Sequence, residues 1–153
     1  MQLADLEPWS YRRDPAVPAF DDSGPVAFMD GECVLCTAGA RLIARFDRTG
    51  AFHICPAQSP TGRAVLRHYG LEPDDPDSWL YLADGRAHTS LDGIIRAGAR
   101  IGGPGWLLQP LRLLPRAAQD WLYRRIARNR YRLFGRTSMC SVPDPRLRAR
   151  LIG

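Results

Sequence analysis

A short apolar segment runs directly into two cysteines that are separated by two residues. Residues 26–29 have the unbroken apolar character of a strand buried on both faces, and Asp30 and Gly31 then turn the chain toward Cys33 and Cys36. Cysteines at this spacing can lie on the first turn of a helix, where free backbone N–H groups and the helix dipole stabilise a thiolate. We therefore expect Cys33 to be the exposed nucleophile and Cys36 to be the resolving thiol behind it.

The segments around this motif alternate between strand-like and helix-like patterns. The predicted elements are, in order, a strand at 26–29, a helix at 36–47, a strand at 51–55, a helix at 60–69, strands at 78–83 and 86–89, and a helix from Thr89 or Ser90 to Ile101. The Asp84-Gly85 pair is typical of a tight hairpin turn, because both central positions need positive φ. The helix that begins at the cysteines supplies the crossover that two parallel strands require. The order βαβαββα predicts an α/β fold with a thioredoxin-like core.

The length of the chain, 153 residues, suits one domain with additions at both ends. Residues 1–24 are polar and contain prolines, so we expect an extended or mobile arm. The core is expected over 25–103, and a C-terminal helical extension packed on it over 104–153, with its main helix at 116–134. An apolar stripe should attach that helix to the core, and it consists of Ala118, Leu122, Ile126 and Leu133.

The charge is distributed unevenly along the chain. Residues 96–153 hold thirteen arginines against two aspartates, a formal charge of +11, whereas residues 1–95 carry −6. Such a basic half can attract nucleic acid, anionic lipid or an acidic partner. Arginines at four-residue spacing along 116–134, however, more often form the solvated face of an amphipathic helix. We therefore expect neither a nucleic-acid partner nor a membrane partner. A peripheral membrane role for residues 106–134 is a less favoured alternative, because Trp and Leu opposite Arg suit a membrane interface.

The sequence indicates a cytoplasmic location. The first 24 residues contain five acidic side chains and no apolar core of a secretory signal, and no uninterrupted apolar run approaches the length that spans a membrane. Four cysteines in a chain of this length do not make a disulfide scaffold. In a reducing compartment, a CxxC pair is typical of a catalytic or metal-binding site.

The cysteine motif and several later segments resemble the DCC family, which is named for its Asp and two Cys in DxxCxxC. The motif is Asp30-Gly31-Glu32-Cys33-Val34-Leu35-Cys36, and the other matching segments are Gln58-Ser59, 112–116, 126–135 and 136–140. Members are small proteins described as thiol-disulfide oxidoreductase-like. The resemblance implies a thioredoxin-like fold, a redox role and a position for Cys140 near the pair, and it supplies no substrate.

The roles of the residues around the pair leave alternatives open. Asp30 either accepts a proton from Cys36 or ties down the turn with its carboxylate. Cys140 could resolve a mixed disulfide, bind a metal or be a small buried apolar side chain. Cys55 lies on a predicted strand and is expected in the core. The three histidines have no ligand spacing and are His53, His68 and His88.

The favoured interpretation is a thiol-disulfide oxidoreductase with Cys33, Cys36 and Asp30 as catalytic residues and Cys140 as an auxiliary. It would exchange electrons with a disulfide-containing protein or small-thiol substrate through a mixed disulfide, and would need no cofactor beyond its own disulfide. The sequence does not identify the thiol electron donor. One alternative is a zinc-binding or structural module, with Cys33, Cys36 and Cys140 joined by a fourth ligand from His53, Cys55 or Asp30. The other is a basic interaction protein with a vestigial redox motif.

Overall fold

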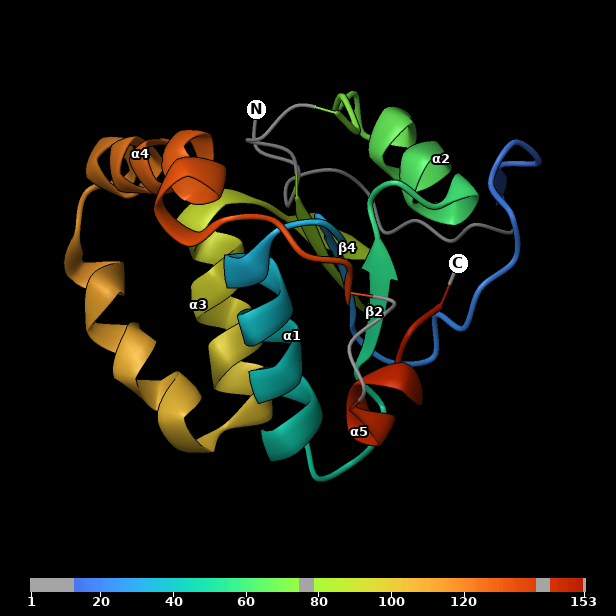
Figure 1. Cartoon of the computed structure of the whole chain (residues 1–153), viewed down its shortest axis with the longest axis horizontal. Helices are drawn as coiled ribbons and strands as arrows, with labels where there is room; N and C mark the ends of the chain where they lie inside the picture. The colour runs from blue at the N-terminus through green and yellow to red at the C-terminus, as the bar shows by residue number, and fades with distance from the viewer. Residues whose placement is uncertain (1–12, 75–78, 140–143, 153) are drawn as a thin grey trace.

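A four-stranded mixed sheet forms the centre of the protein (Figure 1). The computed structural model describes residues 13–74, 79–139 and 144–152. The strands are β1 (Val26–Met29), β2 (His53–Pro56), β3 (Leu80–Ala83) and β4 (Arg86–His88), in the order β2-β1-β3-β4. β1 is parallel to β2 and antiparallel to β3, which is antiparallel to β4. Helices α1 (Val34–Phe46), α2 (Pro60–His68) and α3 (Ser90–Ile101) complete the order βαβαββα, which confirms the predicted thioredoxin-like core.

Helices cover both faces of this sheet, with α2 on one face and α1 and α3 on the other (Figure 1). All four residues of β1 are buried, as the apolar run predicts. Phe28 contributes to the apolar cluster that contains Val65 and Leu66 of α2. Its neighbour Ala27 contributes to the cluster on the opposite face, which contains Ile43 of α1. The alternation of side chains along a strand therefore builds two cores from one sheet.

The local signals for turns and helix starts are confirmed. Asp84 and Gly85 adopt φ values of 53° and 74°, which the hairpin between β3 and β4 requires. Ser59 caps α2 by accepting a hydrogen bond from the Gly62 N–H at 3.0 Å. α1 begins two residues before the predicted start, at Val34, with Cys33 as its N-cap. The first cysteine therefore stands immediately outside the helix and the second stands within its first turn.

Part of the segment expected to be an arm is packed on the core. Residues 1–12 lie outside the described residues. Val17 and Phe20 are 6% and 9% exposed, and Phe20 meets Phe28 edge to face with ring centroids 5.8 Å apart. Two apolar side chains in an otherwise polar stretch therefore complete the α2 face of the sheet.

The C-terminal extension consists of a 3₁₀ helix, η3 (Gly103–Leu113), and the helices α4 (Arg116–Phe134) and α5 (Pro145–Arg148). Both η3 and α4 pack against α3, and α4 also contacts α1. After α5 the chain runs beside β2, where the Ile152 N–H donates to the Ile54 carbonyl at 2.9 Å. Arg150 Nη1 binds the buried Asp47 carboxylate at 2.6 Å and holds this end of the chain to the end of α1.

The expectation that the apolar stripe attaches α4 to the core is met only in part, because Ala118 and Leu122 are half-buried whereas Ile126 and Leu133 are exposed. The buried residues of α4 are Gln119, Ala127 and Arg130. Ile126 and Leu133 are 40% and 66% exposed. The contacts that face the core are the Arg130 ion pair with a buried carboxylate near the cysteines and the packing of Tyr123 against the apolar cluster that contains Ile43.

Candidate active site

The two cysteines of the motif lie together at the N-terminus of α1. Cys33 is the N-cap residue, with φ −95° and ψ 129°, and its sulfur accepts a hydrogen bond from the Cys36 N–H at 3.5 Å. The hydroxyl of Thr37 donates to the Cys33 carbonyl at 2.9 Å and fixes the same turn. The free N–H groups and the dipole of the helix therefore act on the Cys33 sulfur, as the spacing of the cysteines predicts.

The electrostatics make the two thiols unequal. The pKa of Cys33 is lowered from 9.0 to about 6, mainly by a hydrogen bond from the Cys36 thiol, with smaller contributions from the Cys36 N–H and the Arg130 charge, while burial opposes the shift. The pKa of Cys36 is raised by the same thiol hydrogen bond, by burial and by the negative charge on Cys33. At neutral pH the pair is therefore a Cys33 thiolate held by a Cys36 thiol.

Cys33 is buried, which differs from the expected exposed nucleophile. The residue has 0% exposure, whereas Cys36 is partly exposed. The segment 135–139 that follows α4, which we call the strap, lies beside this cysteine, because Arg136 and Cys33 form a backbone bridge. It pairs with the turn before α1, since Thr137 N–H donates to the Glu32 carbonyl at 2.8 Å and Met139 N–H donates to the Gly31 carbonyl at 2.7 Å. This pairing joins residues about a hundred positions apart, so no local pattern marks it.

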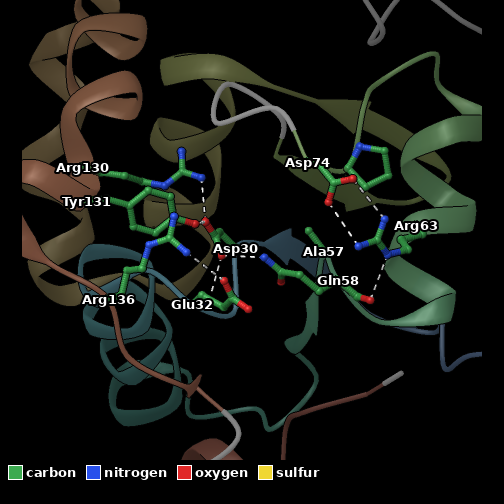
Figure 2. Close-up of a pocket in the computed structure, with 10 residues that line it drawn as sticks. Asp30, Glu32, Ala57, Gln58, Arg63, Asp74, Arg130, Tyr131 and Arg136 are labelled. Atoms are coloured by element: carbon green, nitrogen blue, oxygen red, sulfur yellow. Dashed lines mark hydrogen bonds and ion pairs between the residues drawn. The ribbon is translucent and has the colours of Figure 1, made fainter.

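Asp30 is the centre of a buried hydrogen-bond network beside the pair. Its Oδ1 accepts from the Glu32 N–H at 2.8 Å and from Gln58 Nε2 at 2.7 Å. Its Oδ2 accepts from Arg130 Nη2 at 2.7 Å and from the Tyr131 hydroxyl. Asp30 is 5% exposed and Arg130 is 6% exposed, so this ion pair is removed from water. The network joins the turn of the motif to α4 and to the start of α2 (Figure 2).

A polar cavity of about 410 Å³ opens next to this network. Figure 2 shows Arg130 and Tyr131 pointing at Asp30 on one side of it and the Arg63–Asp74 pair on the other side. Three arginines and three carboxylates alternate around the cavity, so neither sign of charge dominates. The residues that line it are Asp30, Glu32, Ala57, Gln58, Arg63, Pro73, Asp74, Arg130, Tyr131 and Arg136.

Three of the predicted site residues, Cys33, Cys36 and Asp30, lie on one turn of the chain. Cys140 lies outside the described residues, so its place near the pair stays a prediction. Cys55 is buried on β2, its sulfur lies 3.3 Å from the Ser59 hydroxyl, and burial raises its pKa to about 11, as expected for a core thiol.

Sequence reasoning assigned no role to the three side chains that hold Asp30. Gln58, Arg130 and Tyr131 fall within segments that resemble the DCC family, and this was the only signal that could have identified them. Arg130 in particular continues a series of arginines along α4, most of which are exposed. Composition and periodicity do not distinguish the buried arginine from its exposed neighbours.

No group of three His, Cys, Asp or Glu side chains within the described ranges could hold a metal ion. The zinc hypothesis also requires Cys140, so it stays an alternative. In the same part of the chain, no helix has both the length and the apolar character needed to cross a membrane.

Comparisons with known proteins agree with the motif. The model of the DCC1-like thiol-disulfide oxidoreductase family matches residues 27–136. The chain is 32% identical over 127 residues to the uncharacterized protein YuxK of Bacillus subtilis (strain 168), covering 83% of this chain and 93% of that protein. It is 29% identical over 123 residues to the DCC family protein At1g52590, chloroplastic, of Arabidopsis thaliana, covering 80% of this chain and 72% of that protein. No solved structure gives a significant match. The matched segment includes the cysteine pair, Asp30 and the residues that bind Asp30, and the chain belongs to the DCC1-like thiol-disulfide oxidoreductase family.

Proposed function

We propose that the protein is a thiol-disulfide oxidoreductase that uses Cys33 and Cys36 as its dithiol-disulfide couple. The observation that carries the proposal is the unequal pair at the start of α1, where the pKa of Cys33 is lowered to about 6 and that of Cys36 is raised. A thiolate is the nucleophile in disulfide exchange, and a neighbouring protonated thiol can resolve the product. The family match supports this class of reaction and leaves the substrate open.

The proposed reaction has two exchange steps. The Cys33 thiolate attacks one sulfur of a substrate disulfide, forming a mixed disulfide and releasing the first substrate thiolate, which takes up a proton. Cys36 then loses its proton and attacks the Cys33 sulfur, forming the Cys33–Cys36 disulfide and releasing the second substrate thiol. The substrate gains two electrons and two protons, and an external thiol returns the pair to the dithiol. In the reverse direction the same steps oxidise a substrate dithiol.

Two further groups have roles in this proposal. Asp30 is a positioning residue, because four donors occupy its carboxylate and hold the turn that carries Cys33. Arg130 places a positive charge that favours the Cys33 thiolate. These contacts favour the structural role of Asp30 over proton transfer from Cys36. A catalytic role for Asp30 stays a prediction.

Exchange at Cys33 also requires that the strap move. Because Cys33 is fully buried and the strap pairs with the turn that carries it, opening of the Thr137 and Met139 backbone pairing is the movement that would expose the sulfur to a substrate disulfide. Opening this pairing breaks few hydrogen bonds, and such local openings occur in native proteins far below the free energy of global unfolding. The substrates we propose are disulfide-containing proteins or small thiols. The proposal includes a cytoplasmic location, where a reducing environment would keep the pair as a dithiol.

The test is the reduction of insulin disulfides by dithiothreitol in the presence of the protein. Wild type should accelerate the reaction and Cys33→Ser should abolish the acceleration. Serine is also a good N-cap, so the variant should keep α1 and its circular dichroism spectrum. The matched control is Cys55→Ala, which removes a buried cysteine away from the pair and should retain activity. Persistence of activity in Cys33→Ser would refute the proposal.

A further inference from the structure

The exposed large apolar side chains of this protein are concentrated in one segment. Within the described residues nine such side chains are exposed, and eight of them lie between positions 106 and 134. Leu107 and Leu113 of η3 are 81% and 89% exposed, and Trp106 and Trp121 are 60% and 64% exposed. Scattered exposed apolar residues are ordinary, but a concentration in two consecutive helices is typical of an interaction surface. The other four are Leu114, Ile126, Leu133 and Phe134.

The two helices lie at one end of the molecule, where both pack against α3 (Figure 1). Their exposed side chains follow from contacts that the candidate active site requires. Arg130 faces inward to bind Asp30, and Tyr123 packs against the core cluster, so Ile126 and Leu133 are left outside. Rotating α4 to bury its apolar stripe would break the ion pair at Asp30. We call the exposed side chains of η3, together with the face of α4 that carries Trp121, the η3–α4 surface; on that face Trp121 lines one hollow with Arg124, Arg125 and Arg128.

The η3–α4 surface is also strongly basic. Residues 103–134 contain seven arginines and a single acidic residue, Asp120, whose carboxylate accepts a hydrogen bond from the Ser90 hydroxyl. Four of the arginines are exposed along α4, and they are Arg124, Arg125, Arg128 and Arg132. A second copy of the chain on this surface would bring arginines against arginines. Charge complementarity therefore requires an anionic partner.

We propose that the η3–α4 surface binds the headgroup region of an anionic lipid bilayer. Exposed leucines and tryptophans can enter the boundary between headgroups and acyl chains, while the arginines contact lipid phosphates. A nucleic acid would use the arginines and tryptophans and leave Leu107 and Leu113 without a role. The expectation of no membrane partner rested on interpreting the arginines of 116–134 as an ordinary solvated helix face, and the exposed leucines and tryptophans of the same segment now favour a different interpretation. This proposal is independent of the proposed redox activity.

The test is flotation of the whole protein with vesicles of phosphatidylcholine alone or with about one-third phosphatidylglycerol, a composition that gives an anionic surface. Wild type should bind the anionic vesicles, and binding should weaken with salt.

Arg124→Gln with Arg128→Gln should lower the partition coefficient about 30-fold. Leu107→Ser with Leu113→Ser should lower it about tenfold or more. The matched controls are Arg48→Gln with Arg67→Gln and Leu42→Ser, which change exposed residues outside the surface and should bind like wild type.

A second readout does not depend on the variants. Because Trp106 and Trp121 are exposed, anionic vesicles with brominated acyl chains should quench tryptophan fluorescence in the wild type. The proposal is overturned if the protein binds neither vesicle, binds both equally, or binds anionic vesicles without quenching and without sensitivity to the leucine substitutions. The proposal is also overturned if the protein dimerises through this surface. In that case the Leu107→Ser, Leu113→Ser double variant would dissociate the dimer, and added vesicles would leave the dimer intact.

Discussion

Removing Arg130 should destabilise the protein far more than removing an exposed arginine of the same helix. Arg130 and Asp30 are 6% and 5% exposed, and Nη2 lies 2.7 Å from Oδ2. Arg130→Met leaves the Asp30 carboxylate buried without a counter-charge. Breaking a buried ion pair in this way costs about 3–5 kcal/mol. Three other donors still bind Asp30, so we expect a loss near the lower end, about 3 kcal/mol.

A double-mutant cycle separates the ion pair from the loss of packing. Asp30→Asn should also destabilise the protein, because it leaves Arg130 buried with no carboxylate. The double variant removes both charges, so its loss should be smaller than the sum of the single losses by about 1.5 kcal/mol or more. The matched control is Glu32→Gln with Arg136→Met, an exposed pair at the same site with Nη1 3.5 Å from Oε2. Its coupling should be below about 1 kcal/mol.

The assay is urea unfolding of the reduced proteins followed by tryptophan fluorescence. A similar slope of the unfolding free energy against urea concentration in all variants checks two-state behaviour. The alkylation rate of Cys33 against pH gives a second readout. Because the Arg130 charge lowers the pKa of Cys33, Arg130→Met should raise that pKa and the Glu32 and Arg136 variants should move it less. A loss below about 1 kcal/mol for Arg130→Met, or additive losses in the Asp30–Arg130 cycle, would refute the reasoning.

Three further predictions concern the cysteines and the strap. The free energy of unfolding of the reduced protein should rise between about pH 6 and pH 9, because the pKa of Cys33 is lowered from 9.0 to about 6 and the native state therefore binds fewer protons than the unfolded state. This contribution is complete above about pH 9 and is lost as the pH falls through about 6. It should be absent when Cys33→Ser is unfolded with urea at the same pH values. When the backbone pairing of the strap is open, mass-resolved alkylation at pH 7 should modify Cys33 and leave Cys36 unmodified. Equal alkylation rates for the two cysteines would contradict the inequality of the pair. Thr137→Pro removes the N–H that pairs with the Glu32 carbonyl and should speed alkylation of Cys33 several-fold. Ser138→Pro should raise the alkylation rate less, because the N–H groups that pair with the turn belong to Thr137 and Met139.

The predictable part of this fold is the part that local chemistry determines. An apolar run, a cysteine pair at the start of a helix and an Asp84-Gly85 turn each act over a few residues, and the structure has all three, with the helix beginning two residues earlier than predicted. The contacts that complete the site are not local. Arg130 meets Asp30 across a hundred positions, and the strap pairs with the turn at Cys33 through backbone groups that composition and periodicity do not mark; only the family resemblance of 136–140 pointed to this place.

Periodicity also gave the wrong inward face for α4. The apolar stripe marks one side of the helix, but the side that meets the core is the neighbouring one, which carries the buried ion pair of Arg130 and the packed ring of Tyr123. A polar contact at a site can thus override the burial of several apolar side chains, and this leaves an exposed surface that a hydropathy pattern alone assigns to the interior.

The most direct test of the redox account is equilibration of the protein in a series of glutathione buffers, followed by acid quenching, unfolding and alkylation, so that every reduced cysteine reacts and is counted by intact mass. The account predicts one reversible transition in which Cys33 and Cys36 lose or regain their reactivity together, as a two-electron couple requires. The transition should be lost in Cys33→Ser and retained in Cys55→Ala. Cysteines that change independently of one another across the series, or that alkylate only after zinc is removed, would contradict it.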